Sequence, residues 1–211
     1  IILAIFLNEV RSRSYQRFVQ TVTYLPHFIS VAALVGIMTV ILSPRSGFVN
    51  LVLIRVFGMK PIYFMAHPAW FRPLYVMSGI WQNIGWGSII YLAALSQVDV
   101  QLYDSAVVDG ASRIRRIWHI ALPTIAPTII IILVLRMGTL FKVGFEKVLL
   151  MYNPVTYETA DIISTYVYRR GLQHAEYSYG TAVGFFNSVI NLVLLIMANY
   201  VARKTTETSL W

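Results

Sequence analysis

Apolar and polar stretches alternate along the whole chain, and their lengths predict helices that cross a membrane. A helix needs about 20 mostly apolar residues to cross a hydrocarbon layer of about 30 Å. The apolar stretch 1–7 is shorter, and we expect it to be the end of a span that begins upstream. Residues 48–57 are also too few, so they predict a helix in the membrane interface. The predicted full spans are residues 18–42 (with Pro26 as a kink or a new helix start), 74–95, 124–140 and 179–202.

Composition supports a membrane protein. Hydrophobic residues make up 57% of the 211 residues and charged residues only 12%, which lies well outside the range of soluble domains. The sequence contains no cysteine, which excludes disulfides and thiolate metal sites. The net charge of +8 is scattered between apolar stretches and forms no basic stripe, so lipid headgroups are the expected partner rather than nucleic acid.

The most informative polar interval, at about residues 97–123, lies between two predicted spans. Its residues predict a short helix, a tight turn and a second helix. Gly110 supplies the backbone freedom that the turn needs, and Asp109 is expected to cap the following helix. Pro123 is expected in the first turn of the next span. An exposed helix-turn-helix between spans has no lipid to pack against, so we interpret it as a docking element.

This interval resembles the cytoplasmic coupling loop of permease subunits in binding-protein-dependent ABC importers. The family pattern is Glu-Ala-Ala, two residues, Asp-Gly-Ala and, further on, Ile-x-Leu-Pro. The sequence has Asp in place of Glu and Ser in place of the first Ala, and both changes are conservative. The matching positions are Asp104, Ser105, Ala106, Asp109, Gly110, Ala111, Ile120, Leu122 and Pro123.

The resemblance implies an all-α membrane protein: a multi-span helical bundle of the type I ABC importer permease fold, similar to methionine importers, with a cytoplasmic coupling helix. It implies one transmembrane permease domain over residues 1–211. The residues above, except Ile120, together with Arg113 and Arg116, are then expected to couple the chain to an ATPase. From the residues alone, these arginines and Arg115 could instead anchor the loop to anionic lipid.

The resemblance also implies partners and a place in the cell. A bacterial cytoplasmic membrane would hold the chain, a second and distinct permease subunit, and two ATPase subunits that use ATP and Mg. An extracytoplasmic solute-binding protein would deliver a sugar or oligosaccharide. The chain itself is expected to be no enzyme and to hold no cofactor and no metal. In agreement, it has no G-x-x-x-x-G-K-[ST] phosphate loop.

Other segments are similar to the carbohydrate branch, and within it to permeases of the lipoprotein- and polysaccharide-associated type. The polar loop 8–17, which includes Arg11, precedes Leu25-Pro26. Near the C-terminus the similar residues are Thr165–Gly171, Tyr177, Tyr179, Gly180 and the tail Glu207–Trp211.

Polar and aromatic residues inside the predicted spans are candidates for the substrate path. Arg136 lies deep in its span, where a charge is costly and usually faces a watery cavity or a bundle interior. Arg136 would suit an acidic sugar such as a uronate, but it could also snorkel or bind a carbonyl. The amides could equally form hydrogen bonds between helices, and the aromatic groups could simply pack. The candidates are Gln82, Asn83, Trp86, Arg136, Asn187 and Asn191.

Two other classes of transporter stay open. The chain could be an ABC permease for a non-sugar solute, or a secondary transporter or channel. We find no convincing internal repeat, which many secondary transporters have, and none of the nine acidic residues lies deep in a predicted span. The four histidines share no metal-ligand spacing, so each is expected to be an isolated surface or interfacial residue.

Overall fold

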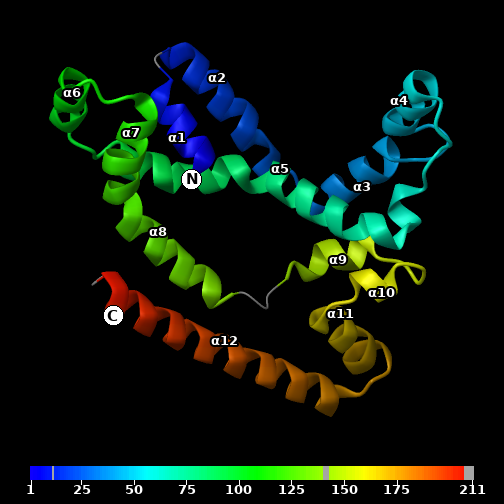
Figure 1. The fold of residues 1–211 in the computed structure, drawn as a ribbon. Helices are drawn as coiled ribbons and strands as arrows, with labels where there is room; N and C mark the ends of the chain where they lie inside the picture. Colours follow the sequence, from blue (N-terminus) through cyan, green and yellow to red (C-terminus); the bar gives the residue numbers. More distant parts are fainter. Residues whose placement is uncertain (11, 140–142, 207–211) are drawn as a thin grey trace. The chain divides into compact units, whose positions relative to one another are not determined.

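The computed structural model describes residues 1–10, 12–139 and 143–206, without the side chains of residues 205 and 206. Arg11, Leu140, Phe141 and the tail Glu207–Trp211 lie outside the described residues. Within them every regular element is helical (Figure 1), as the predicted all-α fold class requires. The helices are α1 (Ile2–Glu9), α2 (Arg13–Tyr24), η1 (Leu25–Phe28), α3 (Val31–Ile41), α4 (Phe48–Phe57), η2 (Phe64–Ala66), α5 (Pro68–Leu95), α6 (Val100–Val108), α7 (Arg113–Arg116), η3 (Ile117–Ala121), α8 (Leu122–Met137), α9 (Phe145–Met151), α10 (Tyr157–Ala160), α11 (Ile163–Val167), η4 (Tyr168–Gln173) and α12 (Tyr177–Thr206).

The chain forms two compact units. The first comprises residues 1–27, 83–140 and 188–211, and the second comprises residues 28–82 and 141–187. Each unit has its own apolar core of buried side chains. In the first unit this core is formed by Ala4, Leu95, Ala121 and Ile125. In the second it is formed by Leu34, Val35, Met38, Phe71, Val148, Met151 and Ala160.

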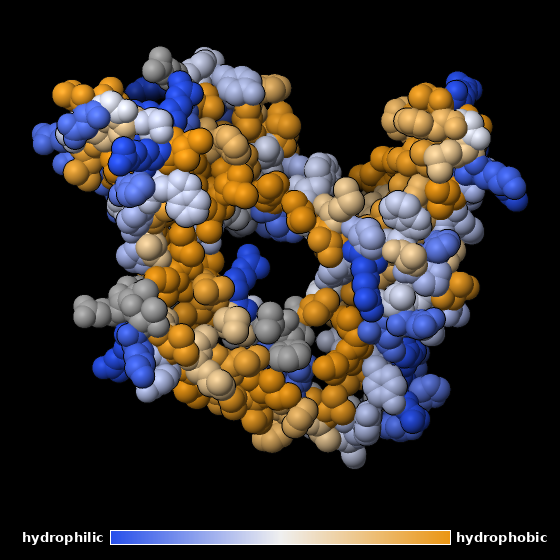
Figure 2. Space-filling model, viewed as in Figure 1, coloured by the Kyte–Doolittle hydropathy of each residue, from blue (hydrophilic) through white to orange (hydrophobic). Residues whose placement is uncertain are grey.

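Two helices in the described part of the chain are long and apolar enough to cross a membrane. They comprise Arg113–Met137 and Tyr177–Lys204. The second contains the predicted span 179–202, and the first contains most of the predicted span 124–140. Apolar residues cover the visible faces of α8 and α12 (Figure 2). Few residues of these helices are buried within the chain, so their apolar faces are available to lipid or to other subunits.

The predicted span 18–42 is not one straight helix. Only together are the helical stretches Arg13–Phe28 and Val31–Ile41 long and apolar enough to cross a membrane. They are bent by 100° at the break between them. Pro26 lacks the N–H that a continuing helix needs. The Oγ of Ser30 accepts a hydrogen bond of 3.2 Å from the Ala33 N–H, so it caps the start of α3. The new helix therefore begins at Val31, and the expected restart at Pro26 was wrong.

The predicted span 74–95 lies within α5, which has 28 residues. By its length α5 could cross the membrane, but it is not among the helices that are also apolar enough. Its amides and glycines account for the difference. Gly85 has a packing reason to be glycine, because a Cβ atom there would lie 2.0 Å from the carbonyl oxygen of Thr23. The backbones of α2 and α5 therefore touch at this point.

The helix predicted for residues 48–57 is present as α4. Buried Asn50 fixes its position, because its Nδ2 donates to the carbonyls of Leu42, Ser43 and Ile62 at 3.0–3.1 Å. Its Oδ1 accepts from the Ile62 N–H at 2.8 Å. One side chain thus ties α4 to the segments on both sides of it.

Candidate functional site

The interval 97–123, which resembles a coupling loop and is given that name below, forms a short capped helix followed by a tight reversal. Asp99 Oδ1 accepts a hydrogen bond of 2.9 Å from the Gln101 N–H at the start of α6. After α6 the chain turns at Gly110, whose φ is +73°. The Ala111 N–H donates to the Ala106 carbonyl at 2.8 Å, and the Gly110 N–H donates to Val107 at 3.0 Å. This is the Schellman pattern of a helix C-terminus, and it confirms the predicted helix and turn.

The cap of the second helix lies further along the chain than we expected. Asp109 is the C-cap residue of α6 and does not cap α7. Ser112 is the N-cap of α7, and its Oγ accepts a hydrogen bond of 3.4 Å from the Arg115 N–H. The turn uses residues 109–111, so the first position with the extended backbone of an N-cap is residue 112.

Pro123 lies in the first turn of α8, as predicted, but no new helix begins there. The helical stretch runs without a break from Arg113 to Met137. A π-helical turn, Ile117–Ala121, directly precedes α8. Proline cannot donate the usual i→i−4 bond, and a π turn is one way in which a helix can accommodate it. The coupling loop is thus joined to a membrane helix by continuous helical backbone.

None of the residues of α6 is buried, and all of them except Tyr103 and Ala106 are exposed. The side chains of Asp104, Ser105 and Asp109 are exposed, and Ala106 and Ala111 are half-buried. Apolar residues are exposed beside them, with Val108 at 86%. In Figure 2 hydrophilic and hydrophobic residues are mixed over α6. Such a surface fits a protein partner better than lipid or water alone. Further along, Leu122 is half-buried and Pro123 exposed.

The arginines of α7 differ in their surroundings. Arg113 and Arg115 are exposed, whereas Arg116 is half-buried and lines a polar cavity of about 410 Å³ in the first unit. An exposed guanidinium can reach a partner or a lipid headgroup. Of the three, Arg113 and Arg115 are therefore placed for contacts outside the chain.

Three of the six substrate-path candidates line one cavity. This cavity belongs to the first unit, has a volume of about 630 Å³ and is bordered by Asn83, Trp86 and Arg136. Arg136 is the one charged residue among the described side chains that line it. Tyr91 and Gly87 also border it, and its other walls are aliphatic: Ile1, Ile84, Ile89, Ile90, Ile129, Ile132 and Leu133.

His27 contacts two of the residues that line this cavity, Trp86 and Asn83. Its ring stacks on Trp86 with centroids 4.5 Å apart and planes 5° apart. Its Nδ1 lies 3.2 Å from Asn83 Oδ1, and Nδ1 must donate because Oδ1 only accepts. The sequence analysis did not predict these contacts of His27. No local spacing could have revealed these contacts, because they join residues 56 and 59 positions apart.

The other three candidates lie elsewhere. Gln82 is buried, and its Nε2 donates to the Ile29 carbonyl at 2.8 Å, beside the break before α3. Asn187 lines a different cavity, of about 570 Å³, in the second unit. Asn191 is buried on α12 and lines none of the cavities described. The candidates are thus divided between the two units, and in the first unit Asn191 does not border the cavity of Asn83, Trp86 and Arg136.

A buried lysine was missed by sequence reasoning, which assigned its segment to a polar connection. Lys147 on α9 is 7% exposed, and its Nζ donates to the Tyr75 carbonyl at 3.0 Å. The ammonium group also lies 4.8 Å from the centroid of the Tyr75 ring. A carbonyl and an aromatic face thus stabilise this charge.

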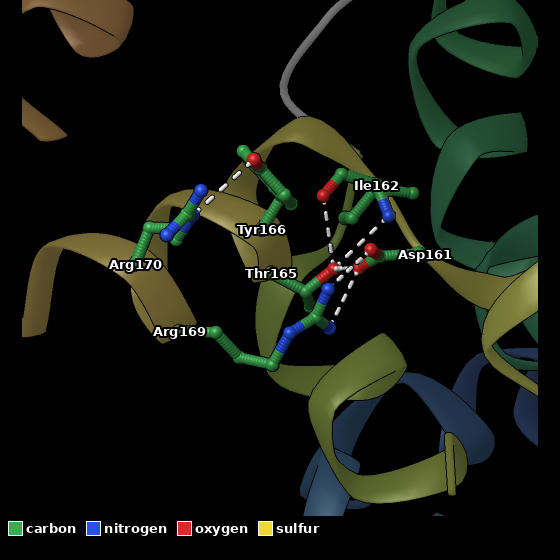
Figure 3. Close-up of polar contacts among 6 residues, drawn as sticks. All are labelled: Asp161, Ile162, Thr165, Tyr166, Arg169 and Arg170. Carbon is green, nitrogen blue, oxygen red and sulfur yellow. Dashed lines mark hydrogen bonds and ion pairs between the residues drawn. The ribbon is translucent and has the colours of Figure 1, made fainter. Parts of the chain in front are cut away.

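The segment Thr165–Gly171 is held by a polar cluster in the second unit (Figure 3). Asp161 forms an ion pair with Arg169, with one contact of 3.0 Å, and accepts a hydrogen bond from Thr165. Burial raises the pKa of the Asp161 carboxyl, but the hydrogen bonds from Arg169 and Thr165 outweigh it and hold the pKa below its ordinary value. The guanidinium of Arg169 also stacks 4.6 Å from the Tyr157 ring centroid. These contacts hold Thr165 and Arg169 against Asp161 and Tyr157.

Residues 1–207 match the family described as the binding-protein-dependent transport system inner membrane component. The chain belongs to this family. The permease resembles protein LplB of Bacillus subtilis (strain 168), with 46% identity over the whole chain and 66% of that protein. It is 44% identical to the polygalacturonan/rhamnogalacturonan transport system permease protein YteP of the same organism, over the whole chain and 65% of YteP. The chain thus spans about two thirds of the length of these relatives.

The permease also matches a solved structure. In the crystal structure of a bacterial alginate ABC transporter in complex with an alginate pentasaccharide-bound periplasmic protein, one chain is 49% identical. The match covers 99% of this chain and 72% of that one, with a TM-score of 0.96. The predicted fold, that of a type I ABC importer permease, is confirmed.

Proposed function

We propose that this permease forms half of the membrane pathway of an ATP-driven importer for oligosaccharides that carry carboxylate groups. A second permease subunit completes the pathway, and two ATPase subunits bind ATP and Mg. An extracytoplasmic binding protein delivers the substrate. The permease lies in the bacterial cytoplasmic membrane as a multi-pass protein and binds no nucleotide or metal of its own.

The observation that carries the proposal is the exposed, rigidly connected coupling helix. The residues Asp104, Ser105 and Asp109 project from α6, and the Gly110 turn joins α6 to a helical stretch that runs on to Met137. A push on α6 from an ATPase subunit would be transmitted along this helix into the membrane. This connection supports the proposed role of α6 as a lever.

The substrate class rests on the cavity beside Asn83, Trp86 and Arg136. A sugar offers hydroxyl groups to an amide and an apolar ring face to an indole. Arg136 can bind a carboxylate through two parallel hydrogen bonds, and its charge in a cavity with mostly apolar walls favours an anionic substrate. The names of two similar proteins point the same way, since alginate and polygalacturonan are both acidic polysaccharides.

Purification with the partner subunits tests the proposal. The permease should copurify with the ATPase subunits, and the ATP hydrolysis of the assembled complex should rise when the solute-binding protein and an oligouronide are added. A matched neutral oligosaccharide should give less stimulation. An importer for a non-sugar solute would respond to the binding protein with another ligand. A channel or secondary transporter would not copurify with an ATPase at all.

A further inference from the structure

The polar cavity beside the coupling helix contains two hydrogen-bond donors without an acceptor. The cavity has a volume of about 410 Å³ and belongs to the first unit. The Oη of Tyr103 and the Nε of Arg116 are buried there, and neither has a hydrogen-bond partner among the described residues. An Arg Nε–H can only donate, and a Tyr hydroxyl donates readily. Buried donors of this kind normally have an acceptor, so their isolation calls for a physical reason.

A suitable acceptor lines the same cavity. Glu9 is the last residue of α1, and its side chain borders the cavity together with Asn8, Ser96, Tyr103 and Arg116. Among the described residues Glu9 forms no ion pair within 4.0 Å. The cavity thus separates one carboxylate from two donors that it could satisfy together.

The charges around Tyr103 keep its hydroxyl in the donor form. Burial is the main reason that the pKa of Tyr103 is raised, and the negative charge of Glu9 adds to it. The nearby Asn8 amide and the positive charge of Arg116 act in the opposite direction, but the pKa stays above its ordinary value. The phenol is therefore protonated at neutral pH and can donate to a carboxylate.

In the proposed mechanism, two of the elements around the cavity belong to the lever. Tyr103 lies on the coupling helix α6, Arg116 ends α7, and Glu9 ends α1. If α6 and α7 move as a lever, the distance from Tyr103 and Arg116 to Glu9 changes with them. Packed elements of this kind tend to switch between two discrete arrangements.

We propose that Glu9, Tyr103 and Arg116 form a latch: the Glu9 carboxylate binds both donors in one end state of the transport cycle and is separated from them in the other. The inference rests on the proposed function, because it needs an ATP-driven movement of α6. The three residues would be positioning residues for coupling. They touch neither the substrate nor the nucleotide.

State-dependent cross-linking tests the latch directly. Because the 211 residues contain no cysteine, the pair Glu9→Cys and Arg116→Cys introduces the only two thiols within them, and any cysteine elsewhere in the subunit would be replaced by serine. In proteoliposomes that hold the assembled transporter, disulfide yield should differ clearly between the nucleotide-free state and the state trapped with ATP and vanadate. Equal yields in both states would overturn the proposal.

Coupling measurements give a second readout that a merely structural role would not change. Glu9→Gln and Tyr103→Phe should lower the amount of sugar imported per ATP hydrolysed by at least about fivefold, the lower end of typical coupling between sites. Basal ATP hydrolysis and membrane insertion should persist. The charge swap Glu9→Arg with Arg116→Glu should restore part of the loss. The exposed carboxylate of Glu158 on α10 offers a matched control, since Glu158→Gln should change nothing.

The two proposals fail in different ways. If the unmodified transporter shows no ATP-dependent uptake, the proposed function is wrong. If it imports sugar normally and the Glu9→Gln and Tyr103→Phe variants keep its ratio of sugar to ATP, only the latch is wrong. Water alone would then fill the cavity in both states.

Discussion

The imidazole ring of His27 lies nearly parallel to the indole ring of Trp86, with centroids 4.5 Å apart. His27 also donates a hydrogen bond to Asn83, so one side chain orients both a stacking surface and an amide. Trp86 and Asn83 in turn border the cavity that contains Arg136. His27 of η1 and Thr23 of α2 thus lie against α5, at Trp86 and Gly85.

Removal of this support should weaken substrate use without affecting the ATPase. His27→Leu should loosen the orientation of Trp86 and Asn83. We expect this to cost about 1.4 kcal/mol of substrate binding, which raises the KM for oligosaccharide uptake by about tenfold. Basal ATP hydrolysis should stay unchanged. His174 is exposed, and His174→Leu serves as the control. An unchanged KM in the His27 variant would show that the stack is not part of the path.

Arg136 should determine the preference for acidic sugars. Arg136→Gln keeps a polar side chain but removes the charge and the paired hydrogen bonds. Uptake of an oligouronide should fall by about ten- to a hundredfold, in line with the 1.5–3 kcal/mol of a charged hydrogen bond. Uptake of the carboxyl-reduced sugar should change little. An equal loss for both sugars would indicate that Arg136 only stabilises the helix.

The turn at Gly110 should be needed for coupling rather than for insertion. Gly110→Val introduces a β-branched side chain at a φ of +73°, which such residues resist. ATP hydrolysis should continue while uptake is lost. Gly58 has a similar φ of +62° and open space around it, so Gly58→Val introduces similar strain away from the coupling helix. Normal uptake by the Gly110 variant would contradict the lever.

The ion pair of Asp161 and Arg169 should stabilise the second unit. The two side chains are 26% and 20% exposed, and Asp161 as a whole residue is exposed. Asp161→Asn should therefore lower stability by about 1 kcal/mol, since it weakens the charge-assisted hydrogen bonds from Arg169 at a site that water can reach. Thermal unfolding of the detergent-purified complex measures this change. The pair Arg170–Glu176 is more exposed, at 48% and 44%, and Glu176→Gln should have little effect.

The same pair predicts a pH dependence. The pKa of Asp161 is lower in the folded protein than its ordinary value of about 3.9. Its stabilising contribution is therefore fully present above about pH 4 and is lost as the pH falls through the folded-state pKa. The difference in melting temperature between the native protein and Asp161→Asn should shrink only below about pH 4. A difference that already shrinks near pH 6 would exclude this origin.

Local features of this protein could be predicted from the sequence, and long-range ones could not. The turn at Gly110 depends on a few neighbouring residues, so it could be predicted from the local sequence. Asn83, Trp86 and Arg136 were three of six candidates, but the sequence did not predict that these three share a cavity, because its walls come from both α5 and α8. Gln82 is adjacent to Asn83 in the sequence, yet it points to the Ile29 carbonyl. The 100° break beside this carbonyl is a tertiary feature. The sequence predicted a kink or a restart at Pro26, but not a new helix that begins at Val31.

Uptake into proteoliposomes tests the central claim most directly. The assembled transporter would be reconstituted with ATP inside, and the binding protein and a labelled oligouronide would be added outside. We predict uptake that requires ATP, Mg and the binding protein together, and that persists when ion gradients are collapsed. Uptake that proceeds without ATP, or that stops when the ion gradients are collapsed, would contradict the assignment as an ATP-driven importer.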